Sequence, residues 1–148
     1  PYHKALQTLL DEARSAFGRA ILVDCHSMPH EALENVRLKT GKRPEIVLGD
    51  RFGASAHPEM VDEIEAAFVA AGFVVSRNTP FAGAYVTQHY GRPSRGQHAI
   101  QIEIDRSLYM DEVKIAPSEN FKAFQDLLRQ VIQEISDIGR DSLSLAAE

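Results

Sequence analysis

The segment Ala20–Ser27 constrains this chain more than any other part of it. Four apolar residues are followed at once by Asp, Cys, His and Ser. An apolar run of this length is typical of a buried strand, and the change to polar residues predicts a strand over 20–24. A buried strand that stops near His26 presents an imidazole at the mouth of a sheet, where α/β proteins place ligands and catalytic groups.

Helical and strand patterns alternate along the rest of the chain. This alternation predicts an α/β fold, a three-layer α/β/α sandwich over a largely parallel or mixed central sheet. Residues 77–96 are predicted to form a loop with a possible short strand at 85–87, and residues 139–148 a frayed tail. The predicted helices span 3–18, 58–71 and 118–138, and the predicted strands 20–24, 45–49, 73–76 and 99–104.

Length and composition narrow the class of protein. A chain of 148 residues suits a single domain with a real core. Its net charge of -5 does not favour binding to the phosphates of a nucleic acid. Its apolar runs are too short to span a membrane. One cysteine permits no internal disulfide, which favours a reducing, cytoplasmic compartment.

Two residues are candidates for chemistry on strands. His26 could bind a divalent metal, with a nearby oxygen orienting its other ring nitrogen, or it could simply bond to a loop carbonyl. Glu103 shares one face of its strand with Gln101 and Asp105. On an edge strand that face would be solvated, whereas on a central strand the carboxylate would be covered, its pKa would rise, and it would become a candidate general base.

Loop residues could recognise a substrate. Arg51, Arg77 and Asn78 suit a carboxylate, because a guanidinium binds one in a bidentate manner, and Tyr85 could donate a hydrogen bond to an oxyanion. The alternatives are a local ion pair at Arg51 and an ordered surface loop with ordinary polar side chains elsewhere.

Cys25 is expected to fill the core. Adjacent strand residues point to opposite faces, so its thiol and the His26 ring should diverge, which disfavours a thiol hydrolase. His30, His57 and His98 have no partner at ligand spacing and are expected to be structural or solvent-facing.

Taken together and in order, four segments resemble the N-formylglutamate amidohydrolase family, relatives of the zinc carboxypeptidases and aspartoacylases. The resemblance implies a zinc-carboxypeptidase-like fold and zinc-assisted hydrolysis of N-formyl-L-glutamate to formate and L-glutamate. The segments are Asp24–Pro29, Ile46–Gly53, Asn78–Gly91 and His98–Glu112.

The resemblance also implies roles for individual residues. His26 matches a histidine ligand of zinc, and Glu103 matches the general base that takes the proton of water. Arg51, Arg77, Asn78 and Tyr85 fall in segments expected to line the pocket for a small N-acyl amino acid.

One expected motif is missing. The superfamily places two zinc ligands in a His-x-x-Glu motif before the strand that carries the second histidine, and this chain contains no such motif. Three protein ligands are usual for catalytic zinc, so we expect zinc binding and turnover by this chain to be weak or absent. The chain is therefore expected to be the C-terminal portion of a longer amidohydrolase, with a non-catalytic carboxylate-binding module of the same fold as the alternative. An unpaired strand edge would then favour a homo-oligomer.

Overall fold

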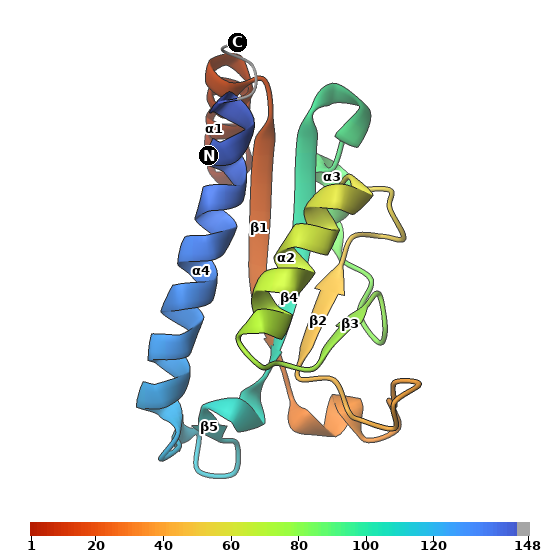
Figure 1. The fold of residues 1–148 in the computed structure, drawn as a ribbon, viewed down its shortest axis with the longest axis vertical. Helices are drawn as coiled ribbons and strands as arrows, with labels where there is room; N and C mark the ends of the chain where they lie inside the picture. The colour runs from red at the N-terminus through yellow and green to blue at the C-terminus, as the bar shows by residue number, and fades with distance from the viewer. Residues whose placement is uncertain (145–148) are drawn as a thin grey trace.

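A computed structural model describes residues 1–144, and the side chains of residues 1–138. Its centre is a mixed four-stranded sheet in the order β1-β4-β2-β3 (Figure 1). β4 pairs in parallel with β1 on one side and antiparallel with β2 on the other, and β2 pairs in parallel with β3. The strands span Ala20–Met28 (β1), Ile46–Gly49 (β2), Val75–Arg77 (β3) and Gln97–Asp105 (β4).

Helices cover both faces of this sheet, which confirms the predicted layered α/β architecture. α2 and α4 lie in front of the sheet in Figure 1, and α1 and α3 lie behind it. The helices span Tyr2–Phe17 (α1), Pro58–Ala70 (α2), Tyr85–Tyr90 (α3) and Phe121–Ser144 (α4). None of the helices in the described part of the chain is long and apolar enough to cross a membrane.

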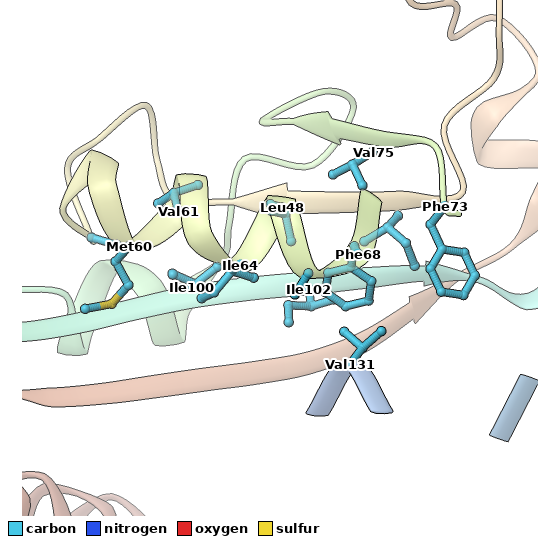
Figure 2. Packing of buried hydrophobic residues seen from close by; sticks show 13 residues of the cluster. Leu48, Met60, Val61, Ile64, Phe68, Phe73, Val75, Ile100, Ile102 and Val131 are labelled. Atoms are coloured by element: carbon cyan, nitrogen blue, oxygen red, sulfur yellow. The ribbon is translucent and has the colours of Figure 1, made fainter. Parts of the chain in front are cut away.

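The larger core lies between the sheet and the α2 and α4 layer. Ile100 and Ile102 of β4 face Ile64 and Phe68 of α2, and Val131 of the neighbouring helix α4 belongs to the same cluster (Figure 2). These five side chains are at most 3 % exposed. The apolar alternation of β4 therefore assigns its isoleucines to this face and leaves its polar residues on the opposite one.

A smaller core anchors α1 and α3 to the opposite face. Leu10 of α1 and Tyr90 of α3 pack there against Ala20 and Ala99. α1 ends at Gly18, whose φ of 73° suits a residue without a side chain and whose N–H donates to the carbonyl of Arg14. This core covers the end of the face where β1 and β4 begin.

Several element boundaries differ from the prediction. The first strand does not stop at residue 24 but continues to Met28, because β4 supplies ladder partners as far as Asp105. The possible strand at 85–87 is wrong, since these residues begin α3. The last helix continues through 139–144, where a tail was expected, and the rest of that tail lies outside the described residues. Short elements that were not predicted are three 3₁₀ turns, at His30–Leu33, Pro93–Arg95 and Arg106–Leu108, and the hairpin of β5 (Met110–Asp111) and β6 (Ala116–Pro117).

Replacing Phe68 by alanine tests the larger core. Phe68 is 1 % exposed, so the variant leaves a cavity and should lower the free energy of unfolding by about 3–5 kcal/mol in chemical denaturation. Val69→Ala is the matched control, because Val69 is 53 % exposed on the same helix and should change stability by less than about 0.5 kcal/mol. Equal losses for the two variants would contradict the packing described.

Candidate functional site

His26 and Glu103 are register partners on neighbouring strands. Residue 26 of β1 pairs with residue 103 of β4 in the parallel ladder. Ladder partners project to the same face, and here that face is opposite to α2 and α4. An imidazole and a carboxylate that are far apart in sequence therefore share one side of the sheet.

Asp24 joins this pair from the same strand. Its Oδ2 lies 3.0 Å from His26 Nε2. That oxygen is buried, and the distance is not accompanied by hydrogen-bond geometry, so Oδ2 has no hydrogen-bond partner among the described residues. A buried acceptor left without a donor beside an imidazole is typical of a site that a proton donor or a cation completes.

Glu103 lies on the central strand, which resolves the two alternatives that its sequence left open. It is 8 % exposed, and its Oε1 accepts a hydrogen bond of 2.7 Å from Gln101 Nε2. Burial raises the pKa of Glu103, while His26 and the Gln101 hydrogen bond act in the opposite direction without cancelling it. A covered carboxylate with a raised pKa is a candidate for a general base.

A close approach of two glycines brings a loop to this face. A Cβ on Gly49 would lie 2.6 Å from the backbone nitrogen of Gly83, so only glycine at position 49 lets the loop cross β2. The N–H of Ala84 then donates to Gln101 Oε1 over 2.9 Å. Gln101 therefore connects the loop to Glu103.

The side chain of Asn78 is hydrogen-bonded within the turn that follows β2. Its Nδ2 donates to Asp50 Oδ1 over 2.6 Å, and its Oδ1 accepts from the N–H groups of Asp50 and Phe52. The φ of 57° at Asn78 is one that asparagine tolerates better than most residues. The Asn78 amide thereby positions the turn that carries Arg51.

Arg51 and Arg77 lie in different environments. Arg51 follows β2, and its Cγ would lie 3.3 Å from a Cβ placed on Gly83, so its side chain lies beside the loop that meets Gln101. Arg77 instead forms ion pairs with Asp62 and Glu65 of α2, on the other side of the sheet. The structure does not bring Arg77 to His26 and Glu103.

Tyr85 lies in a cluster of rings between α1 and α3. It is 56 % exposed, and its hydroxyl lies 3.3 Å from His89 Nδ1. Its ring is 5.4 Å from that of His3. No contact between Tyr85 and either His26 or Glu103 is present in the described part of the chain.

The potential metal ligands described on this face do not form a complete metal site. Among the side chains described, those of residues 1–138, no group of three His, Cys, Asp or Glu residues could hold a metal ion. Catalytic zinc usually has three protein ligands. His26 has the chemistry of one such ligand, but the donors around it do not fit a zinc ion without further ligands.

Sequence reasoning missed a polar chain at the end of β4. Asp105 Oδ2 lies 2.7 Å from His30 Nδ1, and His30 Nε2 in turn contacts the guanidinium of Arg43. The shared face of Gln101, Glu103 and Asp105 was the available signal. His30 and Arg43 carry no spacing that would reveal their approach.

Cys25 is exposed, so the expectation that it fills the core is wrong. The reason is topological, since β1 has β4 as its single neighbour among the described strands and lies at the sheet edge. Partial burial of the thiol, and secondarily the Asp24 carboxylate, raise the pKa of Cys25. Such a thiol is poorly suited to be an activated nucleophile.

The stability of a Glu103→Gln variant tests the environment of this carboxylate. Because its pKa is raised on folding, Glu103 favours the folded state below its ordinary pKa of 4.5 and loses that contribution as the pH rises through the higher folded value. The variant should therefore be more stable than the native chain at neutral pH, with a difference that shrinks toward acid pH in thermal unfolding. A difference that grows toward acid pH would contradict the raised pKa.

Alkylation of Cys25 by iodoacetamide tests the thiol. We expect a slower reaction at pH 7 than for a free cysteine peptide, because a raised pKa leaves less thiolate. The rate should rise with pH along a curve displaced to higher pH than that of the peptide. If Cys25 reacted faster than the peptide at pH 7, the result would support a thiol mechanism.

Comparison with known proteins identifies the family to which this chain is similar. Residues 1–110 match the N-formylglutamate amidohydrolase family. The chain is 35 % identical to N-formylglutamate deformylases of Pseudomonas aeruginosa, over 140 residues, and of Pseudomonas putida, over 147 residues. Each alignment covers 91 % of this chain, and the chain spans about half the length of these curated relatives, 49 % and 51 %.

A solved structure agrees with the sequence comparison. The crystal structure of N-formylglutamate amidohydrolase from Ralstonia eutropha JMP134 is similar with a TM-score of 0.79 and 33 % identity, over 95 % of this chain and 49 % of that one. The match extends through both layers of helices and the mixed sheet. This chain belongs to the N-formylglutamate amidohydrolase family.

Proposed function

We propose that the face bearing His26 and Glu103 is the hydrolytic face of an amide hydrolase acting on N-formyl-L-glutamate. The observation that carries the proposal is the register pairing of these two residues beside the buried Asp24 oxygen. The related deformylases of two Pseudomonas species support the substrate. Since the chain spans half the length of these relatives, only slow turnover is proposed for the isolated chain.

Glu103 is proposed as the general base. It would take a proton from water as the water oxygen attacks the formyl carbon, and pass it to the nitrogen when the carbon–nitrogen bond breaks. Formate and L-glutamate are then released, and the atoms balance without another reactant. Its raised pKa, caused mainly by burial, suits a group that must both accept and return a proton.

Other residues would bind and position. Arg51 is the proposed ligand of a substrate carboxylate, because it lies beside the Gly83 loop with no ion-pair partner among the side chains of residues 1–138. Asn78 would position the turn of Arg51, and Tyr85 would border the pocket. Arg77 is assigned to the contact between β3 and α2. His26 would contribute one ligand to a zinc ion only together with ligands that this face does not supply.

A carboxylate-binding module without catalysis is the second candidate. It is favoured by the incomplete set of metal ligands among the described side chains. It would keep Arg51 and the loop around Gly83 but would not hydrolyse the bound amide. Binding without turnover distinguishes it from the hydrolase.

Formate release from N-formyl-L-glutamate, with and without added zinc, tests the role of Glu103. We expect slow release by this chain, and a reduction of about 100-fold or more in Glu103→Gln, since the removal of a general base costs rate of this order. Glu63→Gln is the matched control, because Glu63 is exposed on α2 and should leave the rate unchanged. Equal rates for Glu103→Gln and the native chain would refute the proposal. Substrate binding without measurable release by the native chain would favour the module.

A further inference from the structure

Three side chains, those of Asp105, His30 and Arg43, contact one another in series where β4 ends, beyond Glu103. Asp105 is 3 % exposed, and its two oxygens accept from the N–H of Ser107, over 2.9 Å, and from the ring of His30. The backbone N–H of His30 is also fixed, because it donates to Glu112 Oε2 over 3.0 Å. His30 is therefore fixed by a hydrogen bond at its backbone and by another at its ring.

The contact with Arg43 determines which ring nitrogen of His30 carries the proton. A guanidinium has N–H donors and no acceptor, so His30 Nε2 must accept from the Arg43 Nη1 group. The proton of a neutral ring then lies on Nδ1 and is donated to Asp105. A buried carboxylate thus orients an arginine through a histidine.

Arg43 keeps its charge available for a ligand. Among the side chains of residues 1–138, no carboxylate lies within ion-pair distance of its guanidinium. The contact with His30 uses one terminal nitrogen and leaves the other N–H donors. An arginine that is positioned by neighbours but not neutralised by them is suited to bind a carboxylate from outside the protein.

The position of Arg43 complements that of Arg51. Asp105 lies two residues beyond Glu103 on the same face, about 7 Å along β4. Arg51 follows Gly49, and Gly49 pairs with Gln101, two residues before Glu103. Glu103 pairs with Val47 of β2, so Arg43, which precedes β2, and Arg51, which follows it, flank that position along the chain.

We infer that Arg43, oriented by His30 and Asp105, binds the side-chain carboxylate of an acidic N-acyl amino acid and thereby selects dicarboxylate substrates. The inference rests on the proposed function. N-formyl-L-glutamate carries two carboxylates, and Arg51 is proposed to bind one of them. Arg43 is the specificity-determining residue, and His30 and Asp105 are positioning residues that touch no substrate.

Calorimetric titration of this chain with N-formyl-L-glutamate and N-formyl-L-glutamine tests the inference. The two probes differ by one carboxylate. The native chain should bind the glutamate compound more tightly, and Arg43→Met should weaken that binding by about 10-fold or more while changing binding of the glutamine compound little. Lys42→Met is the matched control, because it removes the same charge from the exposed neighbouring residue of the loop.

Three further measurements separate binding from a general structural effect. His30→Phe should reduce the preference for glutamate as Arg43→Met does, and Arg43→Lys should restore part of it. Nitrogen-15 spectra of the His30 ring should report the proton on Nδ1 in the native chain. Restored preference in Arg43→Lys is a result that a merely structural role of Arg43 would not produce.

Several results would overturn the inference. These are equal affinity of the native chain for the two probes, no measurable binding of either, or an unchanged preference in Arg43→Met. Failure of the proposed function would look different. In that case the preference for glutamate would depend on Arg43 while formate release did not depend on Glu103.

Discussion

The pairing of β1 with β4 is the interaction on which the rest of the candidate site depends. Nine consecutive residues of each strand are in register, from Ala20 with Gln97 to Met28 with Asp105. A shift of one residue would turn every side chain of β1 to the opposite face, and His26 would then point away from Glu103. The isoleucines of β4 and Ile21 and Val23 of β1 favour this register, because both sets pack on the side of α2 and α4.

The polar face of β4 is unusual because it is buried while carrying carboxylates. Glu103 and Asp105 are both less than a tenth exposed, on the polar face of β4, which is one of the two inner strands. Buried carboxylates are costly unless they are protonated or supplied with donors. Gln101 supplies a donor to Glu103, and His30 and Ser107 supply donors to Asp105. The face therefore carries two carboxylates in different settings: Glu103, whose pKa is raised, and Asp105, which orients His30.

Contacts with the sheet fix the positions of the loop around Gly83 and of the turn after β2. Gly49 allows the chain around Gly83 to pass directly over β2, and Asn78 fastens the turn after that strand. Arg43 and Arg51 are both carried by such connecting segments, before and after β2. A rigid sheet that presents reactive groups while loops supply recognition is a common division of labour in α/β proteins.

Local pattern alone determined the layered α/β class, the helices at both ends, the split of β4 into an apolar and a polar face, and the segments that reveal the family. These properties follow from periodicity and from short-range residue order. The extension of β1 to Met28, the exposure of Cys25 and the ion pairs of Arg77 with α2 were decided by tertiary structure. Each depends on which strand lies next to which, and residues far apart in sequence set that order. The approach of His30 and Arg43 to Asp105 is of the same kind, because contacts made through irregular loops leave no periodic signal in the residues that form them.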